Sequence, residues 1–353
     1  MNNELKKNLR NVVPYVPGEQ PKVENIIKLN TNENPYPPTP LVKKVLDGYN
    51  VDSLRLYPDP ASSDLVNALA KRYNVKPSQV FTGIGSDDVL ALCFMAYFNS
   101  GKPVIFPEIT YSFYKVWAEL FNTPYETFSL NEDLTVNVSD FIDRENGGLL
   151  IANPNAPTGI ALSKADIRKI CEANQDVVVI VDEAYVDFAE DSMVDLVDEY
   201  ENLVVVQTFS KSRSMAGMRI GYAIGNEELI KVLNDVRYSF NSYPLTRLSV
   251  CTGVAAIEDE DTFRENIEKI KKTREWTKGE LTRLGFTFPD SETNFIFATH
   301  KSVKAVDIFN KLKEKHIFVR YFNSPKIDNY LRITIGTDDE MKTFIEEVEK
   351  IVV

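Results

Sequence analysis

Short apolar runs recur along the first two-thirds of the chain, and each is followed by polar residues and then by a helical pattern. The clearest of these runs lie at residues 149–152, 177–181, 203–206 and 220–224. Apolar runs of this length, bounded by turn-forming residues, are typical of strands buried on both faces. Strands that alternate with helical stretches at this spacing predict a parallel, helix-covered α/β sheet.

The last third of the chain has a different pattern. A helical region is expected from Pro244 to about Leu284, with alternating charges that indicate a solvated face. Shorter strands and two further helices follow it, which predicts a smaller α+β domain with its own sheet. We therefore expect three parts: an N-terminal arm at residues 1–30, a large domain at 31–245 and a small domain at 246–353.

A glycine-containing turn separates the strand expected near residues 80–83 from an apolar helix. Gly85, Ser86 and Asp87 stand where that helix begins. A helix start directs free backbone N–H groups outward, which suits an anion. Ser86 could instead simply cap the helix. A dinucleotide loop is the poorer alternative because no third glycine completes GxGxxG. The turn best fits a cradle for a single phosphate.

Polar residues follow the carboxyl ends of four expected strands, at Ser86, Asn155, Asp182 and Lys211. In open α/β sheets this edge is where ligands bind. Lysine forms Schiff bases with carbonyl compounds, so Lys211 is a candidate covalent centre, although a loop lysine is more commonly just solvated.

Asp182 follows five consecutive apolar residues, so its carboxylate is expected to be partly desolvated and to need a cationic partner. A protonated pyridine nitrogen is such a partner in enzymes that use pyridoxal 5′-phosphate (PLP). Tyr185 and Asn155 could then hydrogen-bond the phenolate oxygen of the same ring. Tyr111, at a strand-end turn, is either a packing aromatic or a platform for a flat ring.

Composition narrows the classes of function. The 353 residues carry 40 Lys and Arg against 52 Asp and Glu, a net charge of −12, which argues against bulk nucleic-acid binding. The three cysteines are far apart without a CxxC pair, so neither a disulfide nor a metal site is expected. With two histidines, the general base is expected to be another residue. No stretch resembles a signal peptide or a membrane span, and we expect a cytoplasmic protein.

Several motifs carry a family resemblance. Asn-Pro-Asn-Ala-Pro-Thr-Gly at 153–159, Asp-Glu-Ala-Tyr at 182–185 and Ser210–Lys211 followed by Gly-Met-Arg-Ile-Gly at 217–221 together resemble the fold-type I PLP-dependent aminotransferases. The stretches at 29–36, 56–59 and 330–336 are further similar to the histidinol-phosphate branch of that family. The resemblance covers nearly the whole chain and implies a large domain with a mostly parallel seven-stranded sheet plus a small α+β domain.

The resemblance also implies roles for individual residues. Lys211 would bind PLP covalently and move the substrate proton, and Asp182 would keep the pyridine nitrogen protonated. Tyr185 would bond the phenolate oxygen and Tyr111 would stack on the ring. Many relatives have Asn where this chain has Ala156, so the second phenolate contact is assigned to Asn155. The residues implied to hold the cofactor phosphate are Gly85, Ser86, Asp87, Thr208, Ser210 and Arg219.

On the substrate side, the resemblance implies that Arg332 clamps the carboxylate of 2-oxoglutarate or glutamate. With Arg320 and Tyr15 it would also bind the phosphate of L-histidinol phosphate, and Asn32 would lie close to the substrate. Bidentate arginine suits both anions. Tyr57 would cross a homodimer interface to the cofactor phosphate of the neighbouring subunit. The implied reaction is transamination between L-histidinol phosphate and 2-oxoglutarate, giving imidazole acetol phosphate and glutamate in histidine biosynthesis.

Three other functions remain compatible with parts of this pattern. One is an aromatic amino-acid aminotransferase, and another is a PLP-dependent threonine-phosphate decarboxylase that would use the same phosphate-binding arginines. The third is a non-catalytic regulator built on the same fold. Regulators of that kind carry a DNA-binding domain, and the residues before the first core strand show neither a helix-turn-helix pattern nor a basic face.

Overall fold

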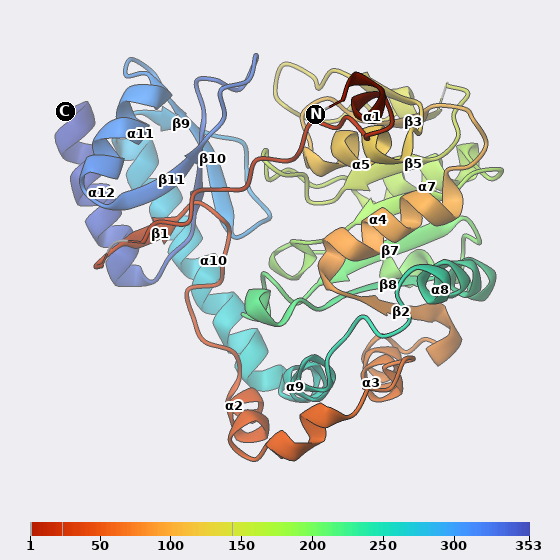
Figure 1. Ribbon diagram of the computed structural model, residues 1–353. Coiled ribbons are helices and arrows are strands. Elements are labelled where there is room, and N and C mark those ends of the chain that lie inside the picture. Colours follow the sequence, from red (N-terminus) through yellow and green to blue (C-terminus); the bar gives the residue numbers. More distant parts are fainter. Residues whose placement is uncertain (1, 23, 143) are drawn as a thin grey trace.

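The structure is a computed structural model that describes residues 2–22, 24–142 and 144–353. Its larger sheet has seven strands in the order β2-β8-β7-β6-β5-β3-β4, and every pairing is parallel except those of β8 with β2 and β7 (Figure 1). The mostly parallel sheet predicted from the apolar runs is therefore confirmed. Its strands are β2 (Val80–Gly83), β3 (Val104–Pro107), β4 (Tyr125–Phe128), β5 (Leu149–Ala152), β6 (Val179–Asp182), β7 (Leu203–Thr208) and β8 (Gly221–Gly225).

Helices cover both faces of this sheet, which explains why its central strands are continuously apolar. Leu149 and Ile151 of β5 face one core, whereas Leu150 and Ala152 face the other. The first core is covered by α2 (Pro40–Asp47), α3 (Ser63–Tyr73), α7 (Lys164–Ala173) and α9 (Arg247–Glu258), and the second by α4 (Gly85–Tyr97), α5 (Phe113–Phe121) and α8 (Glu227–Phe240).

A smaller sheet has the order β1-β11-β12-β10-β9 and packs against α10, α11 and α12. The strand β1 pairs parallel with β11, opposing Ile27 to Ile317, while the other pairs are antiparallel. The N-terminal segment thus joins a sheet otherwise made by the end of the chain. The bounds are β1 (Ile27–Leu29), β9 (Phe286–Thr287), β10 (Phe295–His300), β11 (Ile317–Tyr321), β12 (Leu331–Thr334), α10 (Glu260–Arg283), α11 (Ala305–Glu314) and α12 (Asp338–Val352).

The helical region expected from Pro244 to Leu284 is divided into two helices. The first ends at Glu258 and the second begins at Glu260, because the side chain of Asp259 accepts from the backbone of Thr262 and caps the second helix. Helix α10 then extends from the neighbourhood of α9 to the smaller sheet (Figure 1). It is the longest helix in the described part of the chain.

The remaining elements are short. They comprise α1 (Asn3–Lys7), α6 (Ser139–Ile142) and the single turns η1 (Val51–Arg55), η2 (Pro77–Gln79), η3 (Val186–Phe188), η4 (Met193–Leu196) and η5 (Ala216–Met218). Within the described ranges, no helix has the length and apolar character needed to cross a membrane, and no group of His, Cys, Asp and Glu could hold a metal ion.

Candidate active site

A cavity of about 240 Å³ lies at the edge where strands β5, β6 and β7 end. Lys211 and Asp182, which are 29 positions apart in the sequence, both line it, as the strand-end argument predicts. The other predicted residues in its wall are Ser86, Asp87, Tyr111, Tyr185, Thr208, Ser210 and Arg219. Most of the predicted cofactor set is therefore brought together in one place.

The Lys211 amine is held by the segment that follows β1. Its Nζ donates to the backbone carbonyl of Thr31 at 2.9 Å and lies 5.9 Å from the ring centre of Tyr185. The Tyr185 hydroxyl in turn accepts from Asn32 Nδ2 at 2.8 Å. Asn32 is in turn hydrogen-bonded to the smaller sheet, since its backbone N–H donates to Thr334 Oγ1, at the end of β12, at 3.1 Å. Segments from both sheets therefore close around the lysine.

The loop after Lys211 is fixed on two further sides. Asn34 Nδ2 donates to the carbonyl of Ser212 at 2.9 Å, and the Ser212 hydroxyl donates to Asp187. Asp187 belongs to η3, the turn that directly follows Tyr185. These contacts fix the position of Lys211 relative to Tyr185.

Asp182 is buried, with 4% of its surface exposed, yet it still faces the cavity. Its Oδ2 accepts from the Tyr114 hydroxyl at 2.8 Å and its Oδ1 from the backbone N–H of Ala184 at 3.2 Å. Burial raises the pKa of Asp182 to about 6, and these two hydrogen bonds oppose the rise. Among the described residues, none with a positive charge forms an ion pair with it. This carboxylate is suited to a cation supplied by a ligand.

The first turn of α4 points into the same cavity. The helix begins at Gly85, and Ile84 at its N-cap offers no side-chain acceptor. A Cβ built on Gly221 would come within 2.3 Å of the Ser86 backbone nitrogen, so only glycine allows β8 and this helix start to approach so closely.

A guanidinium and two hydroxyls complete this part of the wall. Arg219 Nη2 lies 3.4 Å from Asp87 Oδ2, and Thr208 Oγ1 lies 3.0 Å from Ser210 Oγ. Together with the N–H groups of the α4 start, these donors can surround a phosphate group.

Tyr111 and Asn155 are placed differently. The Tyr111 ring lines the cavity, and its hydroxyl donates to Asp87 Oδ1 at 2.8 Å, so it is more than core packing. Asn155 Oδ1 instead accepts from Thr110 Oγ1 at 2.8 Å, and its Nδ2 donates to the Ile109 carbonyl at 3.1 Å. Of the two neighbouring residues, Ala156 lines the cavity and Asn155 is not among the described residues in its wall.

A second cavity of about 520 Å³ shares Tyr111 and Ala156 with the first. It is lined by the predicted substrate residues Tyr15, Arg320 and Arg332.

The guanidinium of Arg332 is only partly satisfied. Its Nη2 donates to the Asn30 carbonyl at 3.1 Å, while its buried Nε has no hydrogen-bond partner within the described part of the chain. Burial lowers the pKa of Arg332 below its usual range. An orphaned guanidinium N–H at a cavity wall is suited to an anionic ligand.

Two other predicted residues lie at the periphery. Tyr15 stacks on Phe113 with ring centres 4.2 Å apart, which holds the N-terminal segment over the second cavity. Tyr57 is 77% exposed and packs on Tyr243 at 4.7 Å. It lines neither cavity within its own chain.

Three contributions were missed by sequence reasoning. Tyr114 lies inside an apolar helical pattern, where nothing marks a hydroxyl that reaches Asp182. The acceptor for Lys211 is a backbone carbonyl, that of Thr31, which has no side-chain signature. Glu33 also lines the first cavity and pairs with Lys28, which lowers its pKa against the effect of burial. The only feature of the sequence that could have indicated a role for Glu33 was the polar composition of its loop.

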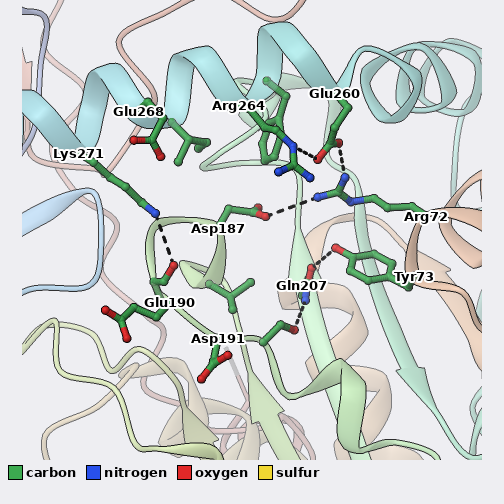
Figure 2. A pocket seen from close by; sticks show the side chains of 15 residues that line it. Arg72, Tyr73, Asp187, Glu190, Asp191, Gln207, Glu260, Arg264, Glu268 and Lys271 are labelled. Atoms are coloured by element: carbon green, nitrogen blue, oxygen red, sulfur yellow. Dashed lines mark hydrogen bonds and ion pairs between the residues drawn. The ribbon is translucent and has the colours of Figure 1, made fainter.

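A separate hollow of about 420 Å³ lies between α10 and the segment after β6 (Figure 2). Arg72 pairs there with Glu260, and the Tyr73 hydroxyl donates to Gln207 Oε1 at 2.6 Å. Gln207 Nε2 in turn donates to Glu183 Oε2 at 2.7 Å. No residue predicted for the active site lines this hollow.

Comparisons with known proteins identify the family. The family model "Aminotransferase class I and II" matches residues 24–348. A histidinol-phosphate aminotransferase of Brachyspira hyodysenteriae is 50% identical over 353 residues, covering 100% of this chain and 99% of the relative. One from Clostridium botulinum is 50% identical over 343 residues, covering 97% of each.

Solved structures have the same fold. The histidinol-phosphate aminotransferase of Sinorhizobium meliloti in complex with pyridoxal-5′-phosphate has a TM-score of 0.85 at 23% identity, covering 92% of this chain and 90% of that one. The enzyme from Clostridium acetobutylicum has a TM-score of 0.86 at 20% identity, with 92% and 99% covered. The chain belongs to the class I and II aminotransferases and, within them, to the histidinol-phosphate aminotransferase family.

Proposed function

We propose that the protein is a PLP-dependent transaminase that exchanges an amino group between L-histidinol phosphate and 2-oxoglutarate. The products are imidazole acetol phosphate and glutamate, in histidine biosynthesis. The observation that carries the proposal is one cavity walled by the Lys211 amine, the buried Asp182 carboxylate and the Arg219 guanidinium. The full-length relatives at 50% identity support the choice of substrate.

The donors and acceptors around the cavity fit PLP. Asp182 is a buried acid that pairs with no cation among the described residues, which matches a protonated ring nitrogen. The N–H groups of the α4 start, where Ser86 and Asp87 line the cavity directly after Gly85, match a phosphate together with the side chains of Thr208, Ser210 and Arg219. When bound, the cofactor supplies an electron-accepting ring that stabilises negative charge at the substrate α-carbon.

Each residue around the cofactor ring would then have its own role. Lys211 Nζ would hold the cofactor at its carbonyl carbon, with loss of water, and would carry the proton that leaves the substrate α-carbon once the substrate amine has displaced it. Tyr185 would donate to the phenolate oxygen, helped by Asn32, which already donates to its hydroxyl. The Tyr111 ring would cover one face of the cofactor. The phenolate contact that the resemblance assigns to Asn155 has no such support, because its amide is held by Thr110 and Ile109 and it is not among the described residues of the cavity wall.

The neighbouring cavity would bind the substrate's anionic end. Arg332 would bind the carboxylate of 2-oxoglutarate or glutamate, and its buried Nε, which has no hydrogen-bond partner among the described residues, supports this assignment. Arg320 and Tyr15 line the same cavity and would join Arg332 on the phosphate of L-histidinol phosphate. One set of donors could thus serve two acids that differ in their anionic group.

We also propose a homodimer in which Tyr57 reaches the cofactor phosphate of the second subunit. The support is a run of exposed apolar side chains beside it: Val51 is 68%, Leu54 57% and Leu56 48% exposed. Exposed apolar patches of this kind mark interaction sites. The division into an arm at 1–30, a large domain at 31–245 and a small domain at 246–353 is part of the same proposal, as is a cytoplasmic location.

The visible spectrum of the purified protein with PLP tests the proposal. L-histidinol phosphate is expected to bleach the yellow absorbance of the bound cofactor, and 2-oxoglutarate is expected to restore it. If an aromatic amino acid bleaches it and L-histidinol phosphate does not, the substrate assignment is wrong. Release of CO₂ from threonine phosphate would point to a decarboxylase instead.

A further inference from the structure

A single side chain among the described residues hydrogen-bonds Asp182, and it belongs to Tyr114. The Tyr114 hydroxyl lies 2.8 Å from Oδ2, while Oδ1 is contacted by a backbone N–H. Each carboxylate oxygen therefore has one protein donor and keeps a lone pair for another. The orientation of this carboxylate depends on Tyr114 more than on any other side chain.

Tyr114 is held rigidly where it can do this. It is the second residue of α5, and none of its surface is exposed. Its ring packs edge-on against Phe106 at 5.7 Å and against Tyr111 at 5.8 Å. A ring packed in this way cannot turn its hydroxyl to another acceptor without disturbing the wall of the cavity.

The direction of the hydrogen bond follows from the two acidities. The pKa of Asp182 is raised to about 6 by burial, whereas burial and the Asp182 charge raise the pKa of Tyr114 well above its usual value. Near neutral pH the carboxyl group is thus ionised and the phenol keeps its proton. Tyr114 donates and Asp182 accepts.

We propose that Tyr114 is a positioning residue for the transamination: its hydroxyl keeps Asp182 ionised and directed at the nitrogen of a pyridinium ring. This inference rests on the proposed function, and it extends that function to a residue outside the cavity wall. Tyr114 touches neither cavity among the described lining residues, so it acts through Asp182 alone.

Another buried tyrosine provides a matched control. Tyr222 is 2% exposed, and its hydroxyl donates to Gln207 Oε1 at 2.6 Å in the polar network around Glu183. Figure 2 shows Gln207 and Tyr73 of that network at the separate hollow. Like Tyr114→Phe, Tyr222→Phe removes a buried hydroxyl, but the lost hydrogen bond is to the amide of Gln207 and not to Asp182.

The test compares PLP with 1-deaza-PLP, in which carbon replaces the ring nitrogen. The dissociation constant of each is measured by titrating the apoprotein of the wild type, Tyr114→Phe and Tyr222→Phe. The wild type is expected to prefer PLP. In Tyr114→Phe this preference is expected to fall roughly tenfold, the worth of one hydrogen bond to a charged group. In Tyr222→Phe the preference for PLP over 1-deaza-PLP is expected to be unchanged, even if this variant is less stable than the wild type.

The possible outcomes separate the two proposals. If the wild type prefers PLP and Tyr114→Phe prefers it equally, the role of Tyr114 is wrong and the proposed function stands. If the wild type shows no preference, the assigned role of Asp182 fails and the role of Tyr114 fails with it. A parallel loss of affinity for both compounds would mean that Tyr114 only supports the fold, which also overturns the inference.

Two further variants guard against misfolding. Replacing Tyr114 with 4-fluorophenylalanine keeps the volume of the side chain and removes only the donor, so the same loss of preference is expected. In an Asp182→Asn background, Tyr114→Phe is expected to leave the affinity for PLP unchanged. An additional loss there would show that Tyr114 acts by another route, contrary to the proposal.

Discussion

Asp182 and Glu183 are adjacent buried carboxylic acids at the end of β6, yet they belong to two different regions. Asp182 faces the cavity of Lys211, and Glu183 faces the polar network behind the hollow of Figure 2. Successive side chains near a strand end point to opposite sides of the sheet. Gln207 and Thr208, on β7, divide in the same way, since Thr208 lines the cavity and Gln207 the hollow.

The two acids differ in how far the protein satisfies them. Glu183 accepts from the Ser192 hydroxyl at 2.7 Å, from the Met193 backbone at 2.5 Å and from Gln207 at 2.7 Å. Asp182 has two donors and an open cavity in front of it. A buried acid that the protein has saturated is structural, whereas one left short of partners awaits a ligand.

The largest effect is expected from Lys211→Ala. Without its amine the cavity loses both the covalent partner and the proton carrier, so kcat is expected to fall by about 10³-fold or more. The fold should survive, as judged by circular dichroism. Lys271→Ala, at the hollow, is the control, with kcat expected within about twofold of wild type. Substantial turnover by Lys211→Ala contradicts the proposed mechanism.

Exchanging each acid for its amide separates the two regions. Asp182→Asn is expected to lower kcat by about 10²-fold with a smaller effect on the free energy of unfolding than Glu183→Gln, because Asp182 accepts from two donors and Glu183 from three. Glu183→Gln is expected to lower the free energy of unfolding by about 1–3 kcal/mol, because its amide N–H₂ meets donors. Steady-state kinetics and urea unfolding measure both. A reversed pattern would mean that the roles of the acids are exchanged.

The pH dependence of stability should identify Glu183 as well. Burial raises its pKa from 4.5 to about 7, so the folded protein holds this proton more tightly than the unfolded chain. Its contribution to stability is full below about pH 4.5, is lost as the pH rises toward 7, and then stays constant. The loss is a few kcal/mol at most. The free energy of unfolding of Glu183→Gln, measured across this range, should show a correspondingly smaller decline than that of wild type.

A smaller effect is expected at the phosphate cradle. Gly221→Ala forces a Cβ to within 2.3 Å of the Ser86 nitrogen, which should displace the α4 start, cost about 1–3 kcal/mol of stability and weaken PLP binding. Gly279→Ala meets nothing within 4 Å and lies inside α10, so it should stabilise the protein by roughly 0.5–1 kcal/mol. Thermal unfolding and PLP titration of both variants check this. Equal PLP affinity in Gly221→Ala and Gly279→Ala would contradict the proposal that the α4 start binds the cofactor phosphate.

The larger sheet, its helices and the polar residues that follow its strands could all be predicted from the sequence. Continuous apolar runs such as 203–206 have no solvent-facing side, which is typical of central strands. Because parallel strands end at one edge, the convergence of Asp182 and Lys211 also followed from the sequence. The role of Tyr57 across a dimer stays a prediction.

The neighbours of each side chain, by contrast, could not be predicted before the chain was seen folded. The sequence left Tyr111 open between packing and site, and its place in the cavity wall decided this. Asn155 and Ala156 are adjacent, and the fold turned the alanine to the cavity and the asparagine to Thr110. Tyr114 and the Thr31 carbonyl had no signal at all. The periodicity of apolar residues indicates which face of a strand or helix each side chain lies on. Hydrogen bonds between distant segments depend instead on distances of a few ångströms, which arise only when the chain is packed.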